Sequence, residues 1–509
     1  MLATSKSGVV IGIKAFPIDI EVDISPGLPS FNMVGLPEGT VRESRERVRA
    51  AIKNCGYPFP TQKITVNLAP ADIKKDGTSL DLPIACAILC TADVITQDSL
   101  KKYCISGELS LDGTVKPTRG VLPLSLAVRN WGLNGYLLSG HNAPEAAVVK
   151  ETNVYPVEHL SQIVGFLSGS LDIEPVSVDL DGLFDRQENW VSDFQDVIGQ
   201  EHAKRALEVA AAGGHNVLMI GPPGSGKTML AKRIASILPP LTFEESLETT
   251  TIYSVAGLLP SEKALISERP FCSPHHTISD AGLIGGGAIP KPGQVSLAHN
   301  GVLFLDELPE FKKNVLEGLR QPIEDGRVTI SRANITLSFP ADFALIAAQN
   351  PCPCGHLGDS RNRCSCHPAH IMRYRNRISG PLLDRIDIQI EVPAVPYSEL
   401  NSARAGEPSS SIRVRVKKAR KIQENRFSGL KIHCNSQMSS SDLNSFCTLS
   451  QESRVFLETV SKKLSLSARA FHRIIKIART IADLDGSSDI HQNHIAEAVQ
   501  YRSLDRAKI

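Results

Sequence analysis

The sequence has few aromatic side chains and almost no excess of charge of either sign. Aromatic residues make up 5% of the 509 residues, and only two of them are Trp. Lys and Arg number 55 and Asp and Glu 54, which gives a formal net charge of +1. This composition argues against a protein that binds nucleic acid on aromatic stacking platforms or through basic charge spread over its whole surface. Any contact with nucleic acid has to be local.

Long hydrophobic runs are also absent. No segment is apolar over the ~18 residues that a bilayer crossing needs, and the longest candidate, residues 82–95, contains Asp93 and is expected to be a buried helix. The N-terminus lacks the long apolar region of a secretion signal. Seven of the eleven Cys are scattered among apolar or helical contexts, as is typical of reduced thiols. These features predict a cytoplasmic protein without a membrane segment.

The length of the chain and the changes in its pattern of strand-like and helix-like segments predict several domains in series. Residues 1–169 alternate short β-rich runs with helical stretches, which indicates a compact α/β domain, and residues 170–192 form an acidic, aperiodic linker. Residues 193–398 alternate strands with helices and indicate a parallel sheet. Residues 399–509 are expected to be helical, with an apolar stripe along 467–484.

A strand followed by a glycine-rich turn marks a phosphate-binding loop. Val-Leu-Met-Ile at 217–220 leads into Gly-Pro-Pro-Gly-Ser-Gly-Lys-Thr at 221–228, which fits G-x-x-x-x-G-K-[ST]. In such a loop Lys227 reaches the β- and γ-phosphate oxygens, Thr228 ligates Mg²⁺ and the helix N-terminus adds its dipole. We therefore expect ATP and Mg²⁺, with nucleotide contacts from Gly221, Pro222, Pro223, Gly224, Ser225, Gly226, Lys227, Thr228, Met229 and Ile198.

Two further apolar strands are expected to end at the same edge of the sheet. Residues 301–305 lead into Asp306 and Glu307, and residues 343–349 lead into Asn350. Asp306 is then placed to hold Mg²⁺ through water, and Glu307 to polarise the attacking water. Asn350 is a candidate for a hydrogen bond to the γ-phosphate or to that water; the alternative is an Asn that only caps its strand.

The residues around this core resemble a known group of ATPases. Val197-Ile198-Gly199-Gln200 precedes the loop, a Gly-rich insertion occupies residues 273–287, and residues 326–339 are expected to form a hairpin around Arg332. With the phosphate loop, they resemble the AAA+ branch that contains magnesium-chelatase subunit I and the MCM helicases. The resemblance implies a homo-hexameric ring whose hairpin points into the pore, with Arg332 as a candidate DNA contact.

Two arginines extend this resemblance. Leu-Leu-Asp-Arg-Ile-Asp at 382–387 is similar to the arginine-finger motif of the branch, which implies that Arg385 acts across a subunit interface and is worth roughly 10³-fold or more in rate. The alternative is an ion pair of Arg385 with Asp384 or Asp387. Arg469, in Ser-Ala-Arg, resembles the second sensor of the lid, which acts on the nucleotide, and Arg473 is the competing choice.

Two C-x-C pairs follow Asn350 directly, and their members are Cys352, Cys354, Cys364 and Cys366. A hairpin with two such pairs can present four thiolates to Zn²⁺ at about 2.3 Å. Three histidines are rival ligands, namely His356, His367 and His370. We expect structural zinc in this inserted loop, residues 351–370; the alternative is a set of reduced thiols without metal.

The N-terminal domain resembles the protease domain of Lon, an α/β fold of the ribosomal S5 domain 2 type. Lys75-Asp-Gly-Thr-Ser79 is similar to the K-D-G-P-S segment of Lon and places Ser79 at the nucleophile. Residues 113–122 match the G-x-V-x-P-x-x-G-x-K stretch, but Leu122 stands where the general-base Lys belongs. A serine without that base is a poor nucleophile. The protease site is therefore predicted to be inactive, and the domain to serve assembly or substrate docking.

The order of these parts resembles the ComM/YifB family of bacteria over essentially the whole chain. Cys-Pro-Cys-Gly at 352–355, Ser-Gly-Pro-Leu-Leu-Asp-Arg-Ile-Asp at 379–387 and Ser-Ala-Arg-Ala-Phe-His-Arg at 467–473 carry the resemblance. It implies a hexameric ATPase and DNA helicase that promotes branch migration in homologous recombination and natural transformation, with recombination proteins as further partners. The alternatives are the motor subunit of a magnesium chelatase and an ATP-binding assembly scaffold.

Positive charge is concentrated in two segments, although the chain as a whole is nearly neutral. Both are candidates for phosphate contacts with single-stranded or branched DNA, and the alternative for residues 413–426 is a solvated helix face. The first segment has one acid, Asp384, and the arginines 361, 363, 373, 375, 377 and 385. The second has Glu407 and Glu424 against the Lys and Arg residues 404, 413, 415, 417, 418, 420, 421, 426 and 431.

Overall fold

The computed structural model describes residues 1–180, 182, 192–260, 263–287, 290–332, 335–359, 362–395, 406–430, 432–464 and 467–502. The chain forms two compact units: unit 1 contains Met1–Arg186 and Phe243–Ser267, and unit 2 contains Gln187–Thr242 and Glu268–Ile509. Several features predicted from the sequence lie outside the described residues, namely most of the second half of the linker, the boundary at 398/399, Arg361, Arg404 and Lys431.

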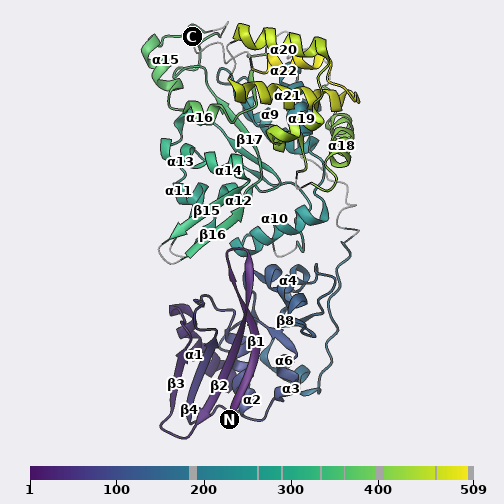
Figure 1. Ribbon diagram of the computed structural model, residues 1–509. Helices are drawn as coiled ribbons and strands as arrows, with labels where there is room; N and C mark the ends of the chain where they lie inside the picture. Colours follow the sequence, from purple (N-terminus) through teal and green to yellow (C-terminus); the bar gives the residue numbers. More distant parts are fainter. Residues whose placement is uncertain are drawn as a thin grey trace. The chain divides into compact units, whose positions relative to one another are not determined.

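Unit 1 is built on a seven-stranded sheet in the order β3-β4-β2-β1-β5-β8-β9. The two long strands β1 and β2 pair antiparallel, and Gly12 at the turn has φ +65°, a conformation that favours glycine (Figure 1). The outer pairs β3–β4, β5–β8 and β8–β9 are parallel. The strands are β1 (Leu2–Ile11), β2 (Lys14–Ser25), β3 (Ser30–Val34), β4 (Lys63–Ala69), β5 (Tyr103–Ile105), β8 (Gly135–Ser139) and β9 (Val154–Val157).

Helix α2, Asp81–Thr91, confirms the buried helix predicted for residues 82–95, although it ends earlier. Every residue of α2 is buried. The helix stops before Asp93, which adopts a left-handed conformation with φ +58°. The apolar run thus lies in the core of unit 1. The other long helices within the first 186 residues are α1 (Gly39–Asn54), α4 (Val121–Trp131) and α6 (Leu160–Ser168).

Helix α10, Phe243–Ala256, completes unit 1, although its sequence lies within the range expected for the ATPase domain. The segment that follows α10 contributes Ala264 and Leu265 to a buried cluster with Leu122 and Val148. Ser254 donates its hydroxyl to the Glu145 carboxylate, which also accepts the backbone N–H of Leu122 at 3.0 Å. Glu145 is buried, and this burial raises its pKa. Residues 243–267 are therefore part of the core of unit 1.

Replacing Glu145 by alanine is expected to lower the unfolding temperature of unit 1 and to expose residues 243–267 to protease. The substitution leaves two buried donors unpaired, the Ser254 hydroxyl and the Leu122 N–H, at about 1–3 kcal/mol each. Thermal unfolding of the full chain and limited proteolysis measure the effect. Glu145→Gln keeps an acceptor oxygen and is the matched control, which is expected to behave much more like the unsubstituted protein. Equal stability of both variants and the unsubstituted protein would contradict the prediction.

Unit 2 contains a five-stranded parallel sheet in the order β11-β14-β17-β10-β18, which confirms the predicted parallel sheet. Its strands are β11 (Phe271–Cys272), β14 (Val302–Leu305), β17 (Ala344–Gln349), β10 (Val217–Ile220) and β18 (Ile388–Glu391). Arg269 donates to the backbone carbonyls of Pro239 at 2.7 Å and Pro240 at 3.3 Å. This side chain holds together the two points at which the chain leaves and re-enters unit 2.

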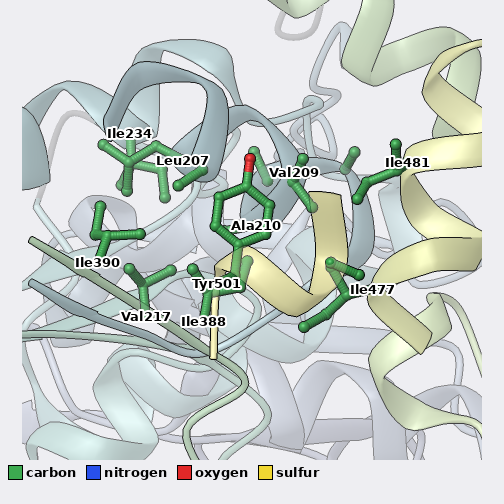
Figure 2. Packing of buried hydrophobic residues seen from close by; sticks show 14 of the residues in the cluster. Leu207, Val209, Ala210, Val217, Ile234, Ile388, Ile390, Ile477, Ile481 and Tyr501 are labelled. Carbon is green, nitrogen blue, oxygen red and sulfur yellow. The ribbon is translucent and has the colours of Figure 1, made fainter. Parts of the chain in front are cut away.

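The C-terminal part of unit 2 is helical, as predicted, and shares one core with the sheet. Figure 2 shows the ring of Tyr501 among Val217 and Ile388 of the sheet and Ile477 of helix α21. The main helices of unit 2 are α8 (Glu201–Gly213), α9 (Lys227–Ile237), α18 (Ser409–Arg426), α19 (Ser440–Phe446), α20 (Gln451–Leu464), α21 (Ala468–Leu484) and α22 (Gln492–Gln500). Within the described residues, no helix combines the length and apolar character that a membrane crossing requires.

Candidate nucleotide-binding site and cysteine cluster

The phosphate-binding loop connects β10 to α9 in the arrangement that the sequence predicts. Gly224 and Gly226 adopt φ values of +73° and +90°, which side chains with a Cβ rarely adopt. Lys227, 8% exposed, donates from Nζ to the carbonyls of Gly221 at 2.7 Å and Pro222 at 3.0 Å. Burial lowers the pKa of Lys227, and the charges of Asp306 and Glu307 oppose this effect. The lysine is thus held within the loop rather than free in solvent.

The two predicted magnesium ligands face each other across the sheet edge. Thr228 Oγ1 donates to Asp306 Oδ2 at 2.6 Å, and Asp306 directly follows β14. The backbone N–H of Glu307 donates to Asp306 Oδ1 at 2.9 Å, and Glu307 itself has φ +52°. A hydroxyl and a carboxylate are hard oxygen donors of the kind that Mg²⁺ prefers. The donor set therefore fits this ion.

Asn350 lies at the same edge of the sheet as Lys227 and Asp306, because β17, which precedes Asn350, runs between β10 and β14. Its Oδ1 accepts from Lys227 Nζ at 3.3 Å, and Gly221 N–H donates to the carbonyl of the preceding residue, Gln349, at 3.2 Å. Three strand ends thus bring Lys227, Asp306 and Asn350 together, as the parallel sheet predicts.

The surroundings of the loop also fit a nucleotide. Ser225 Oγ is buried and has no hydrogen-bond partner within the described residues, so it has a spare hydrogen bond to give. Gln200 donates from Nε2 to Pro393 O at 2.5 Å and to Ser225 O at 3.4 Å, and it also lines a cavity of about 660 Å³ together with His202 and Glu391. Ile198 is half-buried and is not among the described residues that line this cavity, and Met229 is 39% exposed on α9.

Arg385 is held inside its own chain by a partner that the sequence did not indicate. Its guanidinium pairs with Glu324 at 2.5 Å, not with Asp384 or Asp387, and donates to Pro381 O at 2.6 Å. Arg385 is 6% exposed, and within the described part of the chain its Nε has no hydrogen-bond partner. One donor of the guanidinium is therefore unused among the described residues of the single chain.

The two candidates for the second sensor have different environments. Arg473 pairs with Asp387 at 3.1 Å, and this arginine is a main cause of the low pKa of Asp387, opposing the effect of burial. Arg469 is exposed on the first turn of α21. Arg473 therefore joins the lid to the sheet, which leaves Arg469 as the candidate for a nucleotide contact.

Three residues with contacts to predicted site residues were not found from the sequence. Asn216, at the amino ends of the strands, accepts the N–H of Leu345 at 2.8 Å and donates to Arg385 O at 3.1 Å, so it ties three chain segments at the start of the sheet. His276 Nδ1 lies 3.5 Å from Glu307 Oε2. Tyr374 is buried, and its hydroxyl faces the backbone N–H of Asn350. No motif marks any of them, since each acts through a contact that is distant in sequence.

The four cysteines of the inserted loop converge. Sγ–Sγ distances are 3.4 Å for Cys352–Cys354, 3.7 Å for Cys352–Cys364 and 3.6 Å for Cys354–Cys364, and all four sulfurs lie within 4.8 Å of one another. Bonds of about 2.3 Å to a tetrahedral Zn²⁺ would place the sulfurs about 3.8 Å apart. A disulfide needs about 2.05 Å instead. The arrangement fits a four-thiolate metal site.

Two of the three rival histidines have other hydrogen-bond partners, and the third, His370, is exposed with its ring near that of His367. His356 Nδ1 lies 3.3 Å from Asp359 Oδ2, and His367 accepts the N–H of Ala369 as the N-cap of α15 (Pro368–Arg375). The metal-ligand group found among the described residues contains the four cysteines and no histidine. Backbone N–H groups of His356 and Ser365 lower the pKa of Cys354 to about 5, whereas the pKa values of Cys364 and Cys366 are raised by burial and by the neighbouring cysteines, against the effect of a backbone N–H group on each.

The predicted hairpin is present, with Arg332 at its tip. Strands β15 (Arg327–Arg332) and β16 (Ile335–Pro340) pair antiparallel, and Arg332 is exposed. A Cβ placed on Gly286 would lie 3.4 Å from Arg332 Nη2, so the Arg332 side chain lies beside the second small ribbon, β12 (Gly285–Gly286) with β13 (Lys291–Pro292). Asn334, in the turn, lies outside the described residues.

The four arginines of α18 contact other parts of the fold. Arg415 pairs with Glu208 and Glu407, Arg413 donates to Ser236 O, Arg420 donates to Ala211 O, and Arg426 pairs with Asp483. The three lysines of the helix are exposed, as the interpretation of a solvated face predicts. In the first basic segment, Arg377 pairs with Glu310, whereas Arg363, Arg373 and Arg375 are exposed.

In unit 1, Leu122, which the resemblance to Lon sets at the expected place of the general base, is fully buried in an apolar cluster. Ser79 is half-buried just before α2, and its carbonyl accepts the N–H of Gly107 at 2.9 Å. Lys75 is fully buried and donates to Gly35 O at 3.0 Å. Burial lowers the pKa of Lys75.

Comparisons with known proteins agree with this architecture. Models of magnesium chelatase subunit ChlI match residues 193–400 and 20–142, and a model of the C-terminal part of that subunit matches residues 406–502. The chain is also 31% identical over 199 residues to Lon protease 2 of Bacillus subtilis, which covers 34% of this chain and 35% of that protein. An AAA+ core with a helical lid and a Lon-like α/β domain is thus the fold of the chain.

Two relatives match the chain from end to end. The competence protein ComM of Haemophilus influenzae is 45% identical over 510 residues, which covers 99% of this chain and 98% of that protein. The protein YifB of Salmonella typhimurium is 44% identical over 510 residues, with coverage of 100% and 98%. Because identity extends over the whole length and the magnesium-chelatase models match most of it, the chain belongs to the ComM/YifB family of magnesium-chelatase-like AAA+ ATPases.

Proposed function

We propose that the protein is an ATP-dependent hexameric DNA motor, a helicase that promotes branch migration during homologous recombination and natural transformation. The observation that carries the proposal is the convergence of Lys227, the Thr228–Asp306 pair and Asn350 in a chain 45% identical to a competence protein. The proposed setting is the cytoplasm, with single-stranded or branched DNA and recombination proteins as partners.

The site residues divide the work of ATP hydrolysis among them. Lys227 neutralises phosphate charge, and Thr228 and Asp306 would hold Mg²⁺, which when bound neutralises the charge that develops on the phosphate oxygens. Glu307, directly after Asp306, polarises the attacking water, and Asn350 orients that water or the γ-phosphate. Catalysis of this kind depends on positioned charges rather than on covalent chemistry with the protein.

Contacts with DNA are proposed to be local, through a few exposed arginines. Arg332 at the hairpin tip and Arg363, Arg373 and Arg375 on and before α15 are exposed, and guanidinium groups bind phosphates well. A hexameric ring repeats each such residue six times around one pore. The pore surface is then basic although the net charge of each chain is close to zero. The Lon-like site of unit 1 is proposed to be inactive in proteolysis, because Leu122 replaces the base.

The test is ATP hydrolysis by the purified protein with and without single-stranded and four-way-junction DNA. We expect DNA to raise the ATPase rate and Arg332→Ala to weaken DNA binding. The slope of log K against log salt is then expected to be smaller by about 1 for each phosphate that the variant no longer binds. Arg327→Ala, at the exposed base of the same hairpin, is the matched control and is expected to change the slope less.

The outcomes separate this proposal from its alternatives. If DNA neither binds nor raises the ATPase rate at low salt, the DNA motor is wrong, and the magnesium-chelatase motor becomes the favoured function because its models match most of the chain. If ATP is bound but not hydrolysed under any condition, the protein is an ATP-binding scaffold.

A further inference from the structure

We propose that the four cysteines hold one Zn²⁺ that fixes Asn350 and the phosphate-binding loop in place, so that metal occupancy sets the rate of ATP hydrolysis. The inference rests on the ATPase part of the proposed function and is independent of DNA. It assigns to the cysteine cluster a role at the nucleotide site, beyond the local stability of its own loop.

The first connection runs through the backbone of the loop. Cys352 is fully buried and lies two residues after Asn350, whose Oδ1 accepts from Lys227 Nζ at 3.3 Å. Anchoring the Cys352 sulfur to a metal therefore restrains the backbone immediately after Asn350. A shift of about 1 Å in a positioning group can cost about 10²-fold in rate.

The second connection runs through the other end of the cluster. Helix α15 begins two residues after Cys366 and carries Tyr374, which is buried with its hydroxyl facing the Asn350 N–H. Burial raises the pKa of Tyr374 to about 12, so the hydroxyl stays protonated at neutral pH. Arg375, the next residue, donates from Nε to Pro351 O at 3.4 Å. Both ends of the cysteine loop thus reach Asn350.

The third connection is a direct contact with the phosphate-binding loop. Gly355, one residue after Cys354, is so close to Pro223 that a Cβ on Gly355 would lie 2.5 Å from Pro223 Cδ. Gly355 has φ +83°, which the turn between Cys354 and His356 requires. The cysteine loop therefore packs against the loop that holds the phosphates, with no room for an intervening side chain.

The sulfur spacing and the exposure of the loop favour a metal as its anchor. Cys354, Cys364 and Cys366 are half-buried, and residues 362 and 363 are exposed. The four sulfurs lie within 4.8 Å of one another, the spacing that one metal ion with four cysteine ligands requires. Zinc with four cysteine ligands is a closed, structural site, so the expected effect is on position and not on direct catalysis.

The experiment uses the full chain, purified without chelator. Metal analysis is expected to find one Zn²⁺ per chain, and Co²⁺ exchanged into the site is expected to give the sulfur-to-metal absorption of tetrahedral thiolate coordination. The double variant Cys354→Ser/Cys366→Ser is expected to lose the metal and to lower kcat for ATP by about 10- to 100-fold. The control is Cys55→Ser, which replaces a partly exposed thiol outside the cluster; this variant is expected to keep the metal and an unchanged kcat.

A second variant keeps the inference testable if the cysteine variant folds poorly. Tyr374→Phe removes only the hydroxyl that faces the Asn350 N–H. It is expected to retain full zinc and Co²⁺ absorption while kcat falls and the KM for ATP changes little, which a general loss of stability would not produce. Tyr374→Ala, which also removes the buried ring, is expected to lower kcat further.

For a protein that hydrolyses ATP, either of two results overturns the inference. One is an active ATPase that contains no metal at the cluster; the other is unchanged kcat in both the metal-free cysteine variant and Tyr374→Phe. A failure of DNA to stimulate hydrolysis would leave these readouts unaffected, because they depend only on metal content and on basal ATP turnover. If the unsubstituted protein hydrolyses no ATP, the proposed function fails while the metal analysis and Co²⁺ absorption still report on the cluster, and the claim of rate control is overturned.

Discussion

Replacing Lys227 by alanine is expected to lower kcat/KM for ATP by about 10²- to 10³-fold or more, the cost of removing one preorganised charge donor from a transition state. Lys227 Nζ lies within hydrogen-bond distance of Gly221 O, Pro222 O and Asn350 Oδ1, at the place where the phosphates are expected. No other Lys or Arg of the described loop residues can replace it, since residues 221–226 contain neither. Steady-state ATP hydrolysis at several ATP concentrations measures the effect.

The matched control is Lys232→Ala, which removes an exposed lysine from the same helix, α9. Its ATPase activity is expected to stay within a factor of about two, because exposed surface charges contribute little. A companion variant, Glu307→Gln, separates binding from chemistry: we expect it to bind a fluorescent ATP analogue normally and to hydrolyse ATP slowly. Retained hydrolysis in Lys227→Ala would show that the loop is not the site of turnover.

The sequence predicts this part of the molecule well because parallel strands have a simple geometry. Once β10, β14 and β17 are recognised as apolar strands of one sheet, their carboxyl ends have to meet, and Lys227, Asp306 and Asn350 are brought together. The spacing of the two C-x-C pairs predicts the cysteine cluster for a similar reason, since a short hairpin can place the sulfurs together.

Other features depend on contacts that no local pattern encodes. Helix α10 can be expected from its own sequence, but its place in unit 1 cannot. Leu265, in the segment that follows the helix, is buried in a cluster with Leu122, which lies more than a hundred residues earlier in the chain. Asn216 acts through a hydrogen bond to the distant N–H of Leu345, and the hydroxyl of Tyr374 faces the distant N–H of Asn350. The basic residues of α18 illustrate the same point, because charge in a sequence does not show whether an arginine pairs with Glu208 or with phosphate.

Replacing Arg385 by alanine is expected to lower the ATPase rate of the assembled protein by about 10³-fold, if this residue is supplied to the nucleotide of a neighbouring subunit. In the single chain its guanidinium pairs with Glu324, which is itself 49% exposed at the side chain, while Arg385 Nε has no partner among the described residues. A trans role requires Arg385 to exchange this carboxylate for a phosphate of the neighbouring subunit, and the half-exposed Glu324 can then be solvated by water. Rates at saturating ATP, with the oligomeric state checked by mass, measure the loss.

A structural role for Arg385 would produce the same loss, so the decisive comparison is made with two further proteins. Glu324→Gln removes the carboxylate partner but keeps Arg385; if the pair only stabilises the fold, this variant loses activity as well, whereas a trans-acting Arg385 leaves it active. Mixing Arg385→Ala subunits with Lys227→Ala subunits places an intact phosphate loop beside an intact Arg385. Activity well above that of either variant alone is then expected, because each protein supplies what the other lacks across the interface. If no mixing ratio restores hydrolysis and Glu324→Gln is as inactive as Arg385→Ala, Arg385 acts within its own chain, and the resemblance to an arginine finger does not extend to its function.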